Sequence, residues 1–182
     1  MKIISTPIKG LLELQPNVFE DSRGYFFESF RADTLAAHGI DVKWVQENQS
    51  HSSVGAVRGL HFQKGPHAQA KLVRVTQGKV LDVVVDLRKG SETYGQAVSL
   101  VLDAKKHNML FIPEGFAHGF SVLETATFVY KCSNYYNKES EGGILWNDPG
   151  LNIDWQVSDP IISEKDCGWN TLEEFTKITG GL

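Results

Sequence analysis

The clearest structural signal in the sequence is KLVRVTQGKVLDVVVDLR, which spans residues 71–88. On both sides of Gln77-Gly78 the residue types alternate, and after the glycine Leu81 and Val83 fall on one face while Asp82 falls on the other. Alternation with a period of two is typical of a β-strand that buries one face. The segment therefore predicts two strands that meet at a turn around Gln77-Gly78.

Similar short runs continue in both directions from this segment. Runs rich in Val, Phe, Tyr and Thr cover residues 97–102, 109–112, 119–123 and 125–132, and upstream runs cover 24–30 and 54–63. Helix is expected only at residues 32–38, ending at Gly39, and after a capping box that begins at Thr171. The pattern predicts a single all-β domain over residues 1–182, a double-stranded β-helix or jelly roll with short helices, one of them C-terminal.

The composition is that of a globular chain with a small negative charge. The 182 residues include 22 Asp and Glu against 18 Lys and Arg, a formal net charge of -4. This balance disfavours non-specific nucleic-acid binding, which depends on basic clusters. No apolar run approaches the roughly 20 residues of a membrane span and no secretory leader is evident, so we expect a cytoplasmic protein without membrane contact. Cys132 and Cys167 form no Cys-x-x-Cys pair and are expected to be reduced thiols.

Two histidines on predicted strands are the first candidates for chemistry. His118 ends a Pro-x-Gly-x-x-His motif at residues 113–118, which resembles the second motif of the metal-binding cupins. The earlier cupin motif is incomplete, because His61-Phe-Gln stands where His-x-His would supply two imidazoles and no acidic residue follows before Gly78. We therefore expect no metal and no cofactor, and side-chain proton transfer becomes the favoured chemistry.

Tyr130 and Arg58 are further candidates for a polar cavity. The period of two places Tyr130 on the inward face together with Phe128. A core tyrosine bonded to the backbone is the alternative for this residue. Arg58 and His61 are three positions apart and would face opposite sides of a regular strand, but a bulge at Gly59 would bring both into one pocket.

Several sequence blocks then occur together along the chain. They are FEDSRGYFFE at 19–28, QENQSHS at 46–52, RGLHFQ at 58–63, QAKLV at 69–73, GFAHGF at 115–120, Tyr130-Lys131 with Tyr135-Tyr136, EGGILWNDP at 141–149 and SEKD at 163–166. In this order they resemble the dTDP-4-dehydrorhamnose 3,5-epimerase family. The resemblance implies a cofactor-free epimerase of dTDP-L-rhamnose biosynthesis that acts on a dTDP-linked 4-keto-6-deoxyhexose, as a homodimer in which binding residues can be shared.

The resemblance also implies roles for individual residues. His61 is expected to be the base with Asp166 behind it, Tyr130 the acid on the opposite face, and Lys71 the cation near the ketone oxygen, with His118 shaping that pocket. The residues expected to bind the nucleotide or the sugar are Arg23, Phe26, Glu28, Gln46, Glu47, Asn48, Arg58, Gln63, Tyr136, Glu141 and Lys165, Tyr136 by stacking on the thymine. Despite the net charge of -4, the cations Arg23, Arg58, Lys71 and Lys165 should then gather in one cavity.

Other interpretations stay open at this point. Ser163 to Asp166 could be only a helix cap, and Lys71 could be an edge-strand lysine that discourages aggregation. The alternatives for function are an epimerase of one carbon, a ketoisomerase, a non-catalytic sugar-nucleotide binding module, or a metal-dependent cupin.

Overall fold

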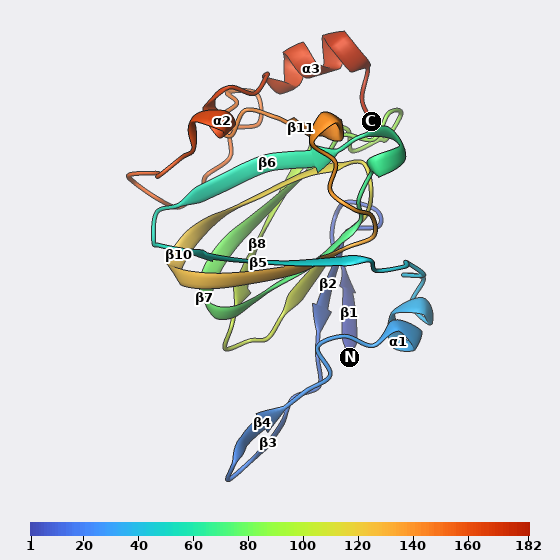
Figure 1. Ribbon diagram of the computed structural model, residues 1–182, viewed down its shortest axis with the longest axis vertical. Helices are drawn as coiled ribbons and strands as arrows, with labels where there is room; N and C mark the ends of the chain where they lie inside the picture. Colours follow the sequence, from blue (N-terminus) through green and yellow to red (C-terminus); the bar gives the residue numbers. More distant parts are fainter.

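Two long strands form the centre of the fold, β7 (Lys71–Asp86) and β10 (Phe116–Cys132). The computed structural model describes residues 1–182, and Figure 1 shows these two strands curving side by side through the body of the molecule. They pair with each other in antiparallel fashion from Phe116↔Asp86 to Cys132↔Lys71. Almost every other strand is added to one half or the other of this pair.

The two halves of the central pair carry different neighbours. The first half of β7 pairs with β9 (Met109–Ile112), which continues to β2 (Leu12–Gln15) and β1 (Lys2–Ser5), and its second half pairs with β8 (Ala97–Asp103). The second half of β10 pairs with β5 (Gln46–Ser52), and its first half pairs with β6 (Val57–Gln63), which continues to β11 (Glu141–Gly143). The nine-stranded sheet therefore folds over itself, as the predicted jelly roll requires.

The inner faces of the two halves enclose the main core. Val73 and Val75 come from the first half of β7, Val80 and Val84 from its second half, and Phe128 from β10. Leu81, Val83 and Val85 face the other way, as the alternation predicts, and pack beneath the C-terminal segment. A third cluster of buried side chains lies beneath α1 (Ala32–Ala36).

The prediction of two strands separated by Gln77-Gly78 was wrong, because β7 runs through this position without ending. The strand bends there instead, opposite an irregular register between Val122 and Phe128 in β10. Gly78 has a φ of 74°, and a Cβ at this position would lie 2.1 Å from the carbonyl oxygen of Thr125. A glycine that looks like a turn in the sequence is thus the bend of a continuous strand.

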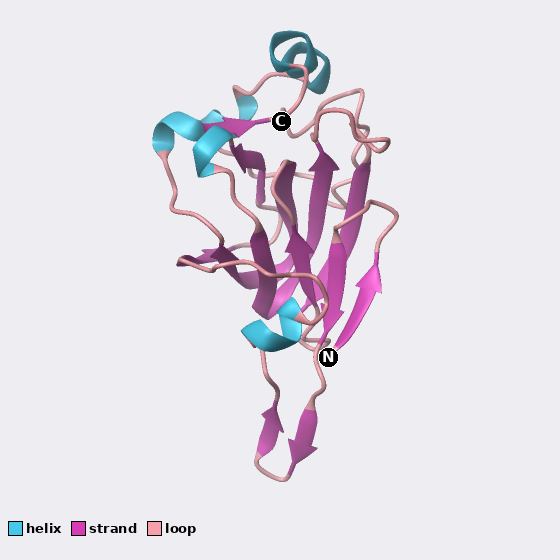
Figure 2. Ribbon diagram, turned by 90° about the vertical axis from the view of Figure 1, so that its right-hand side faces the viewer, coloured by secondary structure: helices cyan, strands magenta, loops and turns pink.

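The helices are short and lie at the ends of the molecule (Figure 2). Helix α1 ends at Ala36, two residues earlier than predicted, and the chain continues to Gly39 with a φ of 83°. Helices α2 (Glu164–Cys167) and α3 (Leu172–Thr179) follow near the C-terminus, and the predicted capping box of Thr171 and Glu174 is confirmed. Two single 3₁₀ turns, η1 (Gly65–His67) and η2 (Lys138–Ser140), complete the helical content. No helix is long and apolar enough to cross a membrane.

One hairpin stands apart from the main sheet. Strands β3 (Phe19–Asp21) and β4 (Gly24–Phe26) pair only with each other and project from the lower end of the body in Figure 1. β4 therefore ends well before residue 30, where the sequence predicted the end of a longer strand. The side chains of Phe19, Tyr25 and Phe26 are more than half exposed on this hairpin.

Candidate active site

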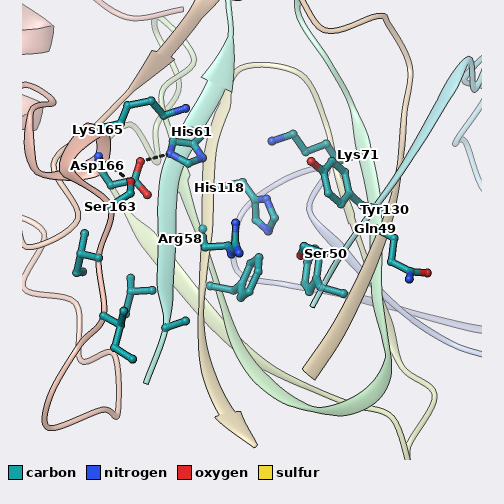
Figure 3. Close-up of a pocket in the computed structure, with 17 residues that line it drawn as sticks. Gln49, Ser50, Arg58, His61, Lys71, His118, Tyr130, Ser163, Lys165 and Asp166 are labelled. Atoms are coloured by element: carbon teal, nitrogen blue, oxygen red, sulfur yellow. Dashed lines mark hydrogen bonds and ion pairs between the residues drawn. The ribbon is translucent and has the colours of Figure 1, made fainter. Parts of the chain in front are cut away.

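A cavity of about 510 Å³ opens between the two halves of the folded sheet. Its lining comes from β5, β6, β7 and β10 and from residues 161–166, segments that lie far apart in the sequence. Figure 3 shows the polar side chains converging on this space. Of the predicted residues, the cavity brings together Arg58, His61, Lys71, His118, Tyr130, Lys165 and Asp166.

His61 and Asp166 form a tight pair on one side of the cavity. Nε2 of His61 lies 2.6 Å from Oδ1 of Asp166, and the backbone N–H of Gly59 donates to Oδ2 at 3.3 Å. Burial raises the pKa of Asp166, but the hydrogen bond and charge of His61 outweigh it and hold this pKa below its ordinary value. The carboxylate can therefore stay ionised and keep the imidazole in one orientation.

Ser163 shows that a helix cap and a catalytic arrangement are compatible at residues 163–166. The Ser163 hydroxyl accepts from the backbone N–H of Asp166 at 3.2 Å and begins α2. This cap fixes the first turn of the helix, and the side chain of Asp166 then points back to His61. The helix cap is thus present, together with the contact to His61 that the catalytic interpretation requires.

Tyr130 and Lys71 face His61 from the other side of the cavity (Figure 3). Burial raises the pKa of the Tyr130 phenol, so that the group stays protonated and can donate a proton. Burial lowers the pKa of the Lys71 amine, and the neighbouring groups Cys132, Asp82 and Glu141 oppose this effect. Lys71 pairs with Ile112 in β9 and with Cys132 in β10, so it lies within the sheet and the edge-strand interpretation was wrong.

Arg58 and His61 share the cavity because β6 contains the bulge considered at Gly59. His61 lies opposite His118 and Arg58 lies opposite Phe120, so three steps on β6 match two on β10. A Cβ on Gly59 would lie 2.5 Å from the Cα of Gly119, which only a glycine avoids. The Arg58 guanidinium donates to the Ser52 hydroxyl at 3.0 Å and borders the cavity with its charge.

A second cavity of about 290 Å³ adjoins the first and shares His61, Lys71 and Tyr130 with it. Among the predicted binding residues, it is lined by Gln46, Asn48, Gln63, Tyr136 and Glu141. The Tyr136 hydroxyl donates to Glu141 at 3.1 Å, and the Lys165 ammonium lies 2.7 Å from the other oxygen of Glu141. Burial raises the pKa of Glu141, but Lys165 outweighs it and leaves this pKa below its ordinary value.

Four predicted binding residues lie elsewhere. Glu47 points to the opposite face of β5 and pairs with Lys131, because alternation separates it from its neighbours Gln46 and Asn48. Arg23 and Phe26 lie on the β3–β4 hairpin, and Glu28 follows it. Within one subunit Arg23 lies apart from the other three cations: it pairs with Asp21 at 2.6 Å and is exposed on a hairpin that pairs with no other strand.

Sequence reasoning missed the apolar end of the first cavity. Phe120 and Phe128 stack there with ring centroids 4.2 Å apart, and Ile161 and Ile162 line the same cavity. The period of two had already placed Phe128 on the inward face beside Tyr130, whereas the isoleucines lie in a loop without a periodic signal. The structure contains no group of three His, Cys, Asp or Glu side chains placed to hold a metal ion.

The jelly roll, with an imidazole–carboxylate pair, a phenol and several cations around one cavity, has the groups that an epimerase of nucleotide sugars needs for proton transfer. The family model described as dTDP-4-dehydrorhamnose 3,5-epimerase matches residues 5–174. The chain belongs to the dTDP-4-dehydrorhamnose 3,5-epimerase family, and it is an epimerase of the isomerase class.

Individual relatives agree over nearly the whole chain. The dTDP-4-dehydrorhamnose 3,5-epimerase of Shigella flexneri is 50% identical over 168 residues, covering 91% of this chain and 93% of the relative. A crystal structure of a dTDP-6-deoxy-D-glucose-3,5-epimerase from Legionella pneumophila, in complex with dTDP-4-keto-L-rhamnose, has a TM-score of 0.91 at 44% identity and covers 94% and 93% of the two chains. A 3'-monoepimerase from Streptomyces bikiniensis, in complex with dTDP-quinovose, has a TM-score of 0.88 at 33% identity, covering 95% and 89%.

Proposed function

We propose that the chain, as one epimerase domain over residues 1–182, converts dTDP-4-dehydro-6-deoxy-D-glucose into dTDP-4-dehydro-L-rhamnose by inverting C3 and C5. The observation that carries the proposal is the placement of His61 and Tyr130 on opposite sides of one cavity, with Lys71 beside the tyrosine. A base and an acid on opposite faces of a sugar ring are what inversion of a carbon centre needs.

The first step is removal of a proton next to the ketone. The hydrogens on C3 and C5 are both alpha to the C4 carbonyl, so one base can take either of them if the ring turns or shifts. His61 is this base in its neutral form, and Asp166 stabilises the imidazolium that results. The electron pair of the broken C–H bond moves into the enolate, with its negative charge on the C4 oxygen.

The second step needs a cation at the enolate and an acid on the far face. The Lys71 ammonium stabilises the enolate oxygen, and the loss of such a preorganised donor typically lowers kcat about 10²- to 10³-fold. Tyr130 then gives its phenolic proton to the carbon from the face opposite His61, which inverts the configuration. Only side chains of the protein are used, so the reaction needs no cofactor.

The nucleotide end of the substrate extends into the second cavity. Arg58 and Lys165 line the first cavity and carry the charge that a diphosphate requires, and Lys165 pairs with Glu141, which lines the second cavity. Tyr136 presents an exposed ring at the rim, where stacking on thymine would contribute about 1–3 kcal/mol. The apolar stack of Phe120 and Phe128 also lines the first cavity and suits a part of the sugar without hydroxyl groups.

The proposal includes a homodimer in which the β3–β4 hairpin serves the neighbouring subunit. Its aromatic residues Phe19 and Phe26 are more than half exposed, and the cation Arg23 pairs only with Asp21 of the same hairpin. Insertion into a second copy would bury these rings and add the missing cation to the site there. A cytoplasmic location is also part of the proposal, supported by the two free thiols, which suit a reducing compartment.

The test is exchange with solvent deuterium. The enzyme and dTDP-4-dehydro-6-deoxy-D-glucose are incubated in deuterated water, and the sugar is analysed by NMR for label at each carbon. Label at both C3 and C5 is expected, and the His61→Asn variant, checked for folding by circular dichroism, should introduce none at either. Absence of label at both carbons with the wild-type enzyme would sink the proposal and favour a binding module.

The second candidate is an epimerase of one carbon. It is favoured by the fold shared with the Streptomyces bikiniensis 3'-monoepimerase, because the two reactions need the same base and acid. They differ only in how the ring is presented to His61 and Tyr130. Label confined to one carbon in the same experiment would establish this alternative.

A further inference from the structure

Two aspartates are completely buried on the same face of β7, Asp82 and Asp86. Asp86 is fully bonded: its oxygens accept hydrogen bonds from Arg88, Ser91 and Thr93, all between 2.6 and 3.0 Å. Burial raises the pKa of Asp86, but these donors outweigh it and hold the pKa far below its ordinary value. Asp86 is therefore a structural group that stabilises the end of the strand and the turn that follows it.

Asp82 has none of these features. Its single partner is His118, whose Nε2 lies 2.9 Å from Oδ2, while its Oδ1 is sealed from solvent without any hydrogen-bond partner. A buried acceptor left without a donor costs about 1–3 kcal/mol. The pair of Asp82 and His118 therefore contributes little to the stability of the fold, and a purely structural role does not account for a carboxyl group at this position.

His118 connects Asp82 to the active site. The ring is buried but lines the first cavity, and its second nitrogen, Nδ1, takes part in no hydrogen bond within the protein. Nδ1 is also not among the sealed polar atoms, which are Asp82 Oδ1 and Trp169 Nε1. Nδ1 therefore remains accessible at the cavity, where Figure 3 shows the His118 ring between His61 on one side and Lys71 with Tyr130 on the other.

The partner of one imidazole nitrogen decides what the other nitrogen can do. A carboxylate at Nε2 requires the proton there, and in a neutral ring Nδ1 is then an acceptor. Burial lowers the pKa of His118 and raises the pKa of Asp82, and the charge and hydrogen bond of each partner oppose the shift of the other. These directions agree with a neutral ring, and Lys71 and His118 both favour the ionised form of Asp82. The cations and the phenol around the cavity are donors, so an acceptor among them would bind a hydroxyl group of the sugar.

We propose that Asp82 is a positioning residue that holds the Nε2–H tautomer of His118 and thereby makes Nδ1 a hydrogen-bond acceptor for a sugar hydroxyl beside Lys71. The inference rests on the proposed function for its substrate, but the tautomer itself is a property of the free protein.

The first measurement is therefore the imidazole ¹⁵N spectrum of the free wild-type protein at neutral pH. The chain has six histidines, and the signals of His118 are identified by their loss in His118→Gln. We expect a protonated Nε2 and an unprotonated Nδ1 in the wild type. In Asp82→Asn the amide can donate to Nε2, and the proton should move to Nδ1 in at least part of the molecules.

The second measurement compares Asp82→Asn with Asp86→Asn, a matched removal of a buried charge four residues away on the same strand. Asp82→Asn should lower kcat/KM about 10- to 100-fold with little loss of Tm, because the wild-type carboxylate is poorly bonded. Asp86→Asn should lower Tm but leave kcat/KM and the His118 spectrum unchanged. One variant thus loses kcat/KM and keeps Tm, and the other loses Tm and keeps kcat/KM. This contrast distinguishes a residue that positions His118 from a residue that stabilises the fold.

Three results would overturn the inference: a wild-type His118 protonated on Nδ1, a wild-type His118 protonated on both nitrogens, or an Asp82→Asn enzyme with unchanged kcat/KM. Should Asp82→Asn not fold, the wild-type spectrum still decides between the tautomers. Failure of the proposed epimerisation is a separate outcome, because it appears in the deuterium experiment and leaves the ¹⁵N spectrum as it is.

Discussion

Asp166 acts on the reaction only through His61, and this makes a clear prediction at the scale of a single residue. Asp166→Asn keeps the size of the side chain but can stabilise the wrong tautomer and no longer balances the imidazolium. We expect kcat to fall about 10²- to 10⁴-fold while KM changes little, as measured by steady-state kinetics. Asp159→Asn, an exposed aspartate in the same C-terminal segment, is the control and should retain full activity. Equal kinetics for the two variants would contradict the role of Asp166.

Lys71 predicts the behaviour of the enzyme in alkali. Burial lowers the pKa of its amine from 10.5, so the ammonium is lost at a lower pH than for a free lysine. Tyr130 has its pKa raised above 10.0 and stays protonated longer. As pH rises, kcat/KM should therefore fall first through loss of the Lys71 charge. In Lys71→Arg this decline should move to higher pH, since a guanidinium keeps its charge. The measurement is the pH profile of kcat/KM for both enzymes. If the decline occurs at the same pH in Lys71→Arg, it is caused by the titration of another group.

The central residues of the site could be predicted from residue types and from the family resemblance. The places where the structure differs from the expected arrangement have physical causes. His61, Lys71, Tyr130 and Asp166 do converge, and their side chains are of the kinds that proton transfer requires. Glu47 lies outside both cavities, on the face of β5 opposite to Asn48, as the period of two already indicates. The surroundings of Arg23 could not be predicted, because they depend on where a separate hairpin projects.

At the scale of elements, the strands were found but their continuity was not. Gln77-Gly78 and Glu124 look like interruptions, and a sequence pattern cannot distinguish the end of a strand from a bend within it. The difference lies in long-range pairing: β7 and β10 keep each other paired on both sides of the irregular register. Such a bend is what lets one pair of strands serve both halves of a jelly roll.

Gly78 provides the test of this bend. Gly78→Ala places a Cβ 2.1 Å from the Thr125 carbonyl oxygen at a φ of 74°, so both strain and a backbone collision oppose it. We expect the free energy of unfolding to fall by well over about 1 kcal/mol, measured by urea denaturation. Gly90→Ala is the control, since Gly90 has a φ of 77° but no atom within 4 Å, and should lose only about 1 kcal/mol. Similar losses in both variants would mean that close pairing at the bend is unimportant.

The whole molecule should lose stability in acid because two of its buried carboxylates, Asp86 and Asp166, have lowered pKa values. In the folded protein the pKa values of Asp86 and Asp166 lie below the ordinary 3.8. Burial alone would raise them, but the hydrogen bonds that each carboxylate accepts outweigh this effect. A carboxyl group whose pKa is lowered by folding stabilises the fold at any pH above its pKa in the unfolded chain. This stabilisation is lost as the pH falls through the pKa of the group in the folded protein. Tm should therefore decline steeply below about pH 4. In Asp86→Asn the free energy of unfolding at neutral pH should be about 1.5–3 kcal/mol lower than in the wild type. The decline of Tm with falling pH should be shallower in this variant.

The proposed exchange of hairpins can be tested between two inactive enzymes. An Arg23→Ala subunit retains His61, and a His61→Asn subunit retains the Arg23 that its neighbour would need. Co-expressed subunits that pair at random should recover about a quarter of wild-type activity, because half are mixed dimers with one complete site. If mass spectrometry shows that mixed dimers have formed but no activity is recovered, the hairpin belongs to the site of its own subunit. Full activity of Arg23→Ala alone would remove the hairpin from the site altogether.

The bond between His61 and Asp166 joins residues 105 positions apart, whereas Lys71, His118 and Tyr130 all belong to the central pair of strands. During synthesis, the acid and the cation are therefore present long before the partner of the base leaves the ribosome. A growing chain that stops short of Asp166 lacks both the carboxylate that orients the base and part of the cavity wall. Epimerisation therefore has to wait until nearly the whole chain has been made.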